Sequence, residues 1–323
     1  MSSALPPVPR CLTIAGSDSG GGAGIQADLK AFAAQGCHGS SAIVALTAQS
    51  TVGVSAVHEL PPAFVVAQLE AVMSDIGADA AKTGMLFSRA IVEAVAGFLE
   101  ERAAATGARL PLVVDPVMIA SSGARLLRED AVASLVARIF PLATVITPNL
   151  HEAEALLGLP GASRKELAEG LVALGAPAAI VTGGHGSDPV DWLFDGREHT
   201  AIPVDRFDIQ ATHGAGCTHS ATLCALLARG LPLVDAARGA AAAATRAVRN
   251  GLAGIGAGAG PVDALDIRTL GAGRGAGATT ARGPPAAPAS EMSVSSACSP
   301  SWSAVASPWT SRTTRHCSGA AWW

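Results

Sequence analysis

The residues of this chain best suited to chemistry lie in a short loop that runs into an apolar helix. Gly214 and Gly216 flank Ala215, and Cys217 follows directly. Backbone N–H groups left bare at a helix start, together with the helix dipole, can bind an anion. A thiol in or beside the first turn is expected to have a lowered pKa and to supply a base or a nucleophile. The alternative is a tight turn before a buried helix, predicted over residues 220–227, with Cys217 as a small core residue.

A second glycine-rich loop, residues 16–24, lies between an apolar strand and a predicted helix. A strand, a glycine loop and a helix start are the usual frame for binding phosphate or a small polar ligand. No Lys-Ser/Thr pair follows the glycines, so the loop is not a Walker loop. Residues 22–27 resemble a dinucleotide fingerprint. The acidic residue expected about 20 positions later is missing, which argues against a Rossmann cofactor.

Apolar strands alternate with helical patterns through most of the chain. The predicted strands are residues 11–15, 41–48, 53–60, 78–83, 112–115, 144–147, 178–181, 190–194 and 199–204. The predicted helices are residues 25–35, 61–76, 88–104, 129–140, 149–157, 165–174, 220–228 and 233–250. This alternation predicts an α/β fold in three layers, with a mostly parallel central sheet and helices on both faces.

Polar and glycine-rich residues repeatedly follow the ends of the predicted strands. They are the loop 16–24, Gln49, Gly84-Met85, Asp115, Asn149 and Gly183. In an open α/β sheet, the edge formed by the strand carboxyl ends is where ligands bind. The pattern therefore predicts one ligand site assembled from several strand ends.

The composition argues against several classes of function. The 323 residues include 22 basic and 26 acidic side chains, without a basic stripe that would bind nucleic acid. No apolar run is long enough to span a membrane, and the first ten residues lack an apolar signal core. The six cysteines form no CxxC pair, which favours a reduced, cytoplasmic protein without disulfides or zinc. Only three lysines occur, so a bound phosphate must rely mainly on backbone amides, arginine or a metal.

The composition changes near residue 268. Residues 271–288 consist of Gly, Ala, Pro, Thr and Arg, and the Ser-rich residues 290–323 hold four of the five tryptophans. A segment of this kind cannot build a packed core. We therefore expect a disordered N-terminus at 1–9, one domain at 10–268 and a low-complexity, disordered tail at 269–323.

Seven segments combine into a specific pattern. They are Leu12–Asp28, Thr47–Gln49, Lys82–Met85, Asp115–Met118, Thr147–Asn149, Gly183–His185 and His213–Thr218. In this order they resemble the hydroxymethylpyrimidine/phosphomethylpyrimidine kinases of thiamine biosynthesis, which have the ribokinase-like fold. The resemblance covers residues 10–268. It implies that ATP, with Mg²⁺, phosphorylates 4-amino-5-hydroxymethyl-2-methylpyrimidine and then its monophosphate, giving the pyrophosphate. We further expect a cytoplasmic homodimer.

By this resemblance, six residues would surround the pyrimidine. They are Ala23, Asp28, Thr47, Gln49, Met85 and Val117. Gln49 offers a donor and an acceptor to the ring edge, and Met85 and Val117 offer apolar contact with its faces. Each also has a structural alternative, since Asp28 could complement a helix dipole, Gln49 could be a polar strand end and Met85 could be core.

The resemblance also implies which residues hold the nucleotide. Asn149 and Glu152 match the Asn-x-x-Glu that orients magnesium on the ATP phosphates, although Asn and Glu at this spacing also form a helix capping box. The nucleotide contacts would come from Asp115, Asn149, Thr182, Gly183 and His213, with His185 as a further candidate. Many family members carry lysine at position 182, so Thr182 puts a lysine contact to the phosphates in doubt.

Cys217 would accept the proton of the substrate hydroxymethyl group, while the amides of Gly214, Ala215 and Gly216 would neutralise the transferring phosphoryl group. Related sugar kinases carry Asp at the position of Cys217. Two alternatives remain open. One is a pyridoxal kinase of the same superfamily, which a lysine able to form a Schiff base would favour. The other is a sensor that binds the pyrimidine without turnover, against which the set of Asn149, Glu152 and Cys217 argues.

Overall fold

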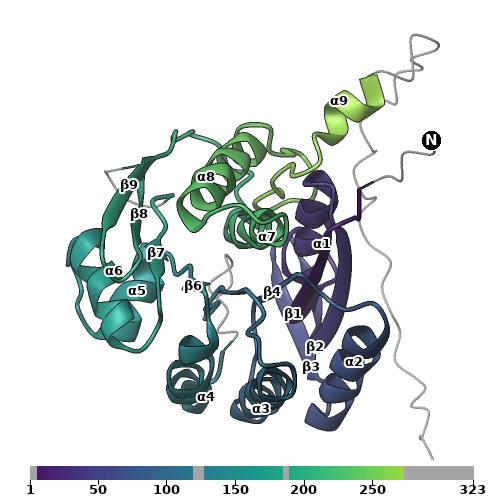
Figure 1. Ribbon diagram of the computed structural model, residues 1–323. Helices are drawn as coiled ribbons and strands as arrows, with labels where there is room; N and C mark the ends of the chain where they lie inside the picture. The colour runs from purple at the N-terminus through teal and green to yellow at the C-terminus, as the bar shows by residue number, and fades with distance from the viewer. Residues whose placement is uncertain (1–5, 119–126, 185–188, 273–323) are drawn as a thin grey trace, which may run out of the picture. The chain divides into compact units, whose positions relative to one another are not determined.

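The computed structural model describes residues 6–118, 127–184 and 189–272, and Figure 1 shows their arrangement. The strands in these residues form one sheet in the order β3-β2-β1-β4-β5-β6-β7-β8-β9. They are β1 (Arg10–Asp18), β2 (His38–Ser50), β3 (Gly53–Glu59), β4 (Ala80–Thr83), β5 (Leu112–Val114), β6 (Val145–Ile146), β7 (Ala179–Val181), β8 (Val190–Phe194) and β9 (His199–Pro203). Sheet neighbours from β2 to β7 run parallel, and β3, β8 and β9 pair antiparallel.

Helices cover both faces of the sheet (Figure 1). One face carries α1 (Gly24–Ala34), α7 (Ala215–Ala228) and α8 (Leu233–Arg249). The other carries α2 (Pro62–Asp75), α3 (Arg89–Thr106), α4 (Glu129–Ser134), α5 (Leu150–Leu157) and α6 (Arg164–Ala173). Successive strand residues alternate between the two cores, as Cys11 and Leu12 do on β1. The predicted α/β fold, with a mostly parallel sheet between helical layers, is confirmed.

Several element boundaries differ from the prediction, and three of the differences have a clear physical reason. Helix α7 begins at Ala215 rather than at residue 220, because Gly214 caps it and Gly216 lies inside its first turn. Strand β1 continues through Gly16, whose missing side chain makes room for the Met85 methyl group. The predicted helix 129–140 changes after α4 into a π-helix, η1 (Leu135–Ile139), and a 3₁₀ turn, η2 (Phe140–Leu142). Pro141 lacks the N–H that would continue an α-helix.

The chain divides into one unit at residues 1–276 and another at 277–323, and the second lies outside the described residues. The boundary predicted at 268 falls inside α9 (Ile267–Ala272). Most of the predicted tail, and residues 1–5 of the predicted disordered N-terminus, also lie outside the described residues. In the part of the chain that the structure describes, no helix combines the length and the apolar character needed to cross a membrane.

Candidate active site

The two glycine loops meet at the carboxyl ends of the parallel strands. A Cβ added to Gly214 would lie 1.8 Å from the carbonyl oxygen of Gly22, and the φ angle of Gly214 is +85°. Only glycine tolerates both the close approach and the left-handed backbone. Because Gly214 caps α7, this contact holds the start of the helix against the loop after β1.

Asp18, which was not among the predicted site residues, organises the first loop. Its carboxylate accepts hydrogen bonds from the backbone N–H groups of Gly20, Gly22 and Ala23. Its Oδ2 lies 3.1 Å from Nε2 of His213. Burial alone would raise the pKa of Asp18, but His213 and the backbone donors hold that pKa below its usual value. An Asp that precedes glycines by two to four residues is a turn-forming pattern, so the sequence carried a signal for it.

Gln49 and Thr47 lie side by side at the end of β2. The Thr47 hydroxyl donates to the Ser17 carbonyl at 2.8 Å and lies 3.1 Å from Oε1 of Gln49. Nε2 of Gln49 lies 3.4 Å from Nε2 of His213. The structure therefore brings Gln49 from β2 and His213 from the second loop to one place, beside Asp18.

The predicted apolar contacts come from two further strand ends. Met85 follows β4 and is 7% exposed, with its methyl group over Gly16. Val117 follows β5 and packs, partly buried, against the core that includes Met85. Half-buried Ala23 lies in the first glycine loop, where its N–H is bonded to Asp18. Core packing thus accounts for most of the Met85 side chain, with a small part left accessible.

Asp28 lies away from any open surface. Its side chain is fully buried, Oδ1 lies 2.7 Å from Nζ of Lys82, and Oδ2 accepts a hydrogen bond from Thr13 at 2.6 Å. Burial disfavours the charge of Lys82, yet the charges of Asp28 and other acidic neighbours raise the pKa of Lys82 above its ordinary value. The carboxylate of Asp28 therefore faces a permanent buried cation, a partner that the sequence did not reveal.

Cys217 sits in the first turn of α7, half-buried. The expectation of a lowered pKa is wrong for this thiol. Burial raises the pKa of Cys217 to about 12, and the charges of Asp28 and Asp115 add to the rise, although Lys82 and the Gly24 backbone N–H oppose it. Desolvation and two carboxylates outweigh what a helix N-terminus contributes. The unliganded protein therefore holds a protonated thiol at neutral pH.

Asp115 directly follows β5 and lies close to α7. Its Oδ2 accepts a hydrogen bond from the Ser220 hydroxyl at 2.8 Å and lies 3.9 Å from Nζ of Lys82. The Asp115 side chain is 7% exposed. Asp115 thus ties the second turn of α7 to a strand end, and its charge lies near the other groups of the site.

Asn149 and Glu152 form the capping box at the start of α5. The Asn149 side chain accepts from the Glu152 N–H, and the Glu152 carboxylate accepts from the N–H groups of Asn149 and Met118. Burial and then the charge of Asp115 raise the pKa of Glu152 to about 8. A carboxylate whose charge is disfavoured by burial and by a second carboxylate lies in a place that favours a cation.

Thr182 and Gly183 complete this edge. Thr182 forms an isolated parallel bridge with Asn149, and its N–H donates to the Pro148 carbonyl. The N–H of Gly183 donates to the buried carboxylate of Asp191 at 2.6 Å, so this amide already has a protein partner. His185 lies outside the described residues.

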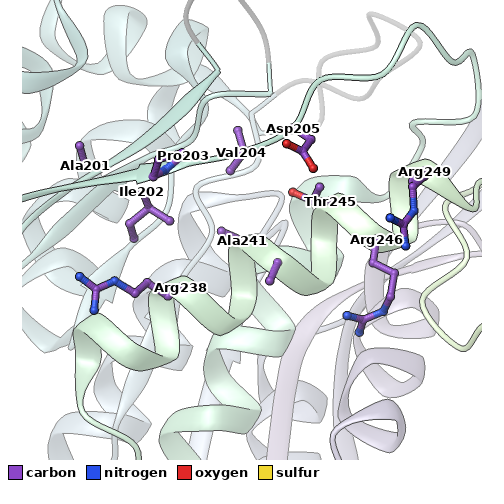
Figure 2. A pocket seen from close by; sticks show the side chains of 11 residues that line it. Ala201, Ile202, Pro203, Val204, Asp205, Arg238, Ala241, Thr245, Arg246 and Arg249 are labelled. Atoms are coloured by element: carbon purple, nitrogen blue, oxygen red, sulfur yellow. The ribbon is translucent and has the colours of Figure 1, made fainter.

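A hollow opens between β9 and α8 on the side of the sheet that carries α7 (Figure 2). Its volume is about 470 Å³, within the range of small-molecule sites. Apolar residues of both elements line it, and Thr245 and three arginines lie along α8. The segment that follows β9 leads from this hollow to His213. No part of the sequence pattern pointed to it.

Comparison with protein families gives one clear match. The model described as phosphomethylpyrimidine kinase matches residues 18–263. The hydroxymethylpyrimidine/phosphomethylpyrimidine kinase of Haemophilus influenzae is 47% identical over 266 residues, which cover 79% of this chain and 96% of that protein. The bifunctional thiamine biosynthesis protein of Geobacter sulfurreducens is 47% identical over 273 residues. That match covers 81% of this chain but only 54% of the longer protein.

Two solved structures are similar over most of the described chain. An ADP complex of Bacillus subtilis pyridoxal kinase has a TM-score of 0.73 at 35% identity, covering 81% of this chain and 99% of that one. The phosphomethylpyrimidine kinase of Clostridium difficile has a TM-score of 0.65 at 38% identity, covering 74% of this chain and 99% of that one.

Proposed function

This chain belongs to the phosphomethylpyrimidine kinase family, and on that premise we propose that it phosphorylates 4-amino-5-hydroxymethyl-2-methylpyrimidine with ATP and then phosphorylates the monophosphate. The products are the pyrimidine pyrophosphate and two ADP, as thiamine biosynthesis requires. The observation that carries the proposal is the 47% identity to a named kinase across 96% of that protein's length. In the first step the hydroxymethyl oxygen bonds to the γ-phosphorus, the bond from phosphorus to the ADP oxygen breaks, and the hydroxyl proton leaves.

The pyrimidine is proposed to bind where the ends of β1, β2, β4 and β5 face the start of α7. Gln49 would pair with the ring amine and a ring nitrogen, and Thr47 would orient the Gln49 amide. Met85 and Val117 would contact the ring faces, and Ala23 would border the ring. The Asp28 carboxylate is fully buried. We therefore propose that it supports the pyrimidine site indirectly, through its ion pair with Lys82.

The transferring phosphoryl group is proposed to lie at the N-terminus of α7. The Ala215 N–H is bonded to the Thr212 carbonyl, so the amides of Gly216 and Cys217 in the first turn are the better donors. Gly214 sets the approach of this turn to Gly22. His213, beside Asp18, would face the same group.

Cys217 is proposed to receive the hydroxyl proton. With a pKa of about 12, its thiol is protonated before substrate binds. Proton acceptance therefore requires that the thiol first lose its own proton, which the nearby Lys82 charge favours. This requirement predicts a rate that increases with pH.

Magnesium is proposed to bind near the start of α5, where Asn149 and Glu152 form the capping box. Among the described residues no group of three or more His, Cys, Asp or Glu side chains forms a ready metal cage. Magnesium bound with ATP usually keeps several waters and uses only one or two carboxylates. Glu152, whose pKa is raised by burial and by Asp115, would hold the ion with Asn149, and Asp115 and Thr182 would lie near the phosphates. The ion would neutralise phosphate charge during transfer.

The hollow between β9 and α8 is proposed to hold the adenosine part of ATP (Figure 2). Its volume suits a nucleoside, and its apolar residues would cover the base. The chain that borders it continues to the Gly214 loop, where the phosphates are proposed to lie.

The pyridoxal alternative is less well supported. The solved pyridoxal kinase has a high TM-score, but sequence relatives at 44–47% identity, such as that of Haemophilus influenzae, are named hydroxymethylpyrimidine/phosphomethylpyrimidine kinases. Lys82 is held by Asp28 and is fully buried, so it does not offer a free amine to an aldehyde. A silent sensor is disfavoured because the relatives are enzymes.

The test is ADP release with hydroxymethylpyrimidine and with pyridoxal, side by side, at varied Mg²⁺, with products identified by mass spectrometry. We expect the pyrimidine monophosphate and then the pyrophosphate, and no product without Mg²⁺. Faster turnover of pyridoxal would overturn the proposal. The homodimer and the cytoplasmic location remain predictions, to be checked by light scattering and by cell fractionation.

A further inference from the structure

His219, in the second turn of α7, is a buried histidine that the proposed function does not use. It is 4% exposed, and its Nε2 lies 3.3 Å from Oδ2 of Asp191. Within the described residues, neither ring nitrogen makes a hydrogen bond. Burying a polar ring without hydrogen bonds costs folding free energy. A residue retained at that cost, beside a carboxylate, is a candidate for a functional role.

Asp191 connects His219 to the end of β7. It lies on β8, is 4% exposed, and accepts the Gly183 N–H with Oδ1 at 2.6 Å. A Cβ on Gly183 would lie 2.2 Å from the Val190 carbonyl oxygen, so the Gly183 backbone is packed tightly against β8. One carboxylate therefore joins α7, β8 and the backbone that follows β7.

The contact continues to the residues proposed to hold the nucleotide. Thr182 precedes Gly183 and bridges to Asn149, which caps α5 together with Glu152. The next residue on α7, Ser220, donates to Asp115 at the end of β5. Two consecutive residues of α7 thus meet two buried carboxylates: His219 lies 3.3 Å from Asp191 on β8, and Ser220 is hydrogen-bonded to Asp115 after β5.

We propose that His219 is a positioning residue for the nucleotide. Through Asp191 it holds the Gly183 backbone in place. The position of Thr182 and Asn149, which are proposed to lie near the ATP phosphates, is thereby fixed relative to the first turn of α7. The proposal rests on the proposed function. It predicts an effect on ATP binding rather than on pyrimidine binding, because Gln49 and Met85 lie on other strand ends.

The test is a double-mutant cycle on the full chain with His219→Leu, Asp191→Asn and the double variant. Each is measured for KM of ATP, KM of hydroxymethylpyrimidine, and affinity for a non-hydrolysable ATP analogue without pyrimidine. We expect His219→Leu to raise the KM of ATP by about tenfold and the pyrimidine KM by less than about twofold. The double variant should be no worse than the more impaired single variant, because coupled residues are not additive.

Two controls separate positioning from stability. Cys224→Ala removes a buried side chain on the same helix, and it should lower the melting temperature without changing the KM of ATP. His219→Gln keeps an N–H donor and should recover part of the ATP affinity, and it carries the test if the Leu variant fails to fold. Any of three results would overturn the proposal. The KM of ATP could be unchanged in His219→Leu, the effects of the two single variants could add in the double variant, or Cys224→Ala could raise the KM of ATP as much as His219→Leu does. A wild-type protein that phosphorylates no pyrimidine would instead refute the proposed function.

Discussion

Nζ of Lys82 lies 2.7 Å from Oδ1 of Asp28, and neither side chain has any exposed surface. The two residues are 54 positions apart, on β4 and α1, and they meet beneath the start of α7. The Lys82 ammonium group lies among Asp28, Asp115 and Cys217, and all three raise the pKa of Lys82. The charge balance at the buried side of the site therefore depends on Lys82, to which the sequence analysis assigned no role.

Replacing Lys82 by Met should destabilise the protein by about 3–5 kcal/mol, because it leaves a buried carboxylate unpaired. The double variant Lys82→Met/Asp28→Leu should recover most of that stability, since an apolar pair needs no compensation. Urea unfolding monitored by circular dichroism measures both, with the exposed Lys165→Met as control. A Lys82→Met protein as stable as wild type would mean that the ion pair contributes little.

Gly214→Ala should cost far more activity than a glycine substitution of similar backbone strain elsewhere. The new Cβ would meet the Gly22 carbonyl oxygen at 1.8 Å, which forces the two loops apart. Gly230 is the matched control, since its φ of +82° is similar and no atom lies within 4 Å of its added Cβ. Both variants should lose about 1–3 kcal/mol of stability from backbone strain, but only Gly214→Ala should lose kcat. Equal kcat in the two variants would argue against a functional contact between the loops.

Gln49→Leu should weaken pyrimidine binding and leave ATP binding unchanged. The substitution leaves ring groups without partners, at a cost of about 1–3 kcal/mol, or roughly 5- to 150-fold in KM. Steady-state kinetics with each substrate varied in turn gives both KM values. If the pyrimidine KM is unaltered, Gln49 does not contact the ring.

Cys217→Ala should lower kcat by about 100- to 10,000-fold with little change in either KM, if the thiol is the base. Because burial raises its pKa to about 12, the thiolate fraction of the wild type increases tenfold with each pH unit below that value. We therefore expect kcat to rise with pH between about 7 and 10, and Cys217→Asp to be more active than Ala with a flatter profile. A kcat in Cys217→Ala close to that of wild type would leave catalysis to the loop amides and the metal.

A chain that ends at residue 276 should fold and turn over like the full-length protein. Every strand that the structure describes, and the helices that form the two cores, precede this point, and the residues beyond it are poor in core-forming side chains. Melting temperature and kcat of the two chains provide the comparison. Loss of either property on truncation would show that the tail has a role in the enzyme.

The sequence alone determined the alternation of strands and helices, because the patterns of apolar residues are local. It also placed Gln49, Met85, Asp115 and Asn149 at strand ends, and parallel strands bring such ends to one edge of the sheet. The Asn149–Glu152 capping box was readable as well, since its spacing lies within one turn. The segments shared with the kinase family were sufficient to name the reaction class.

Tertiary structure decided which polar side chains meet. Asp18 with His213, Lys82 with Asp28 and His219 with Asp191 join residues from separate elements. The pKa of Cys217 was predicted in the wrong direction because desolvation and neighbouring carboxylates depend on the packed surroundings, whereas the helix start is visible in the chain. Burial and long-range electrostatics exist only once the sheet and both helical layers are assembled, so local sequence could propose site residues but could not predict the pKa of Cys217.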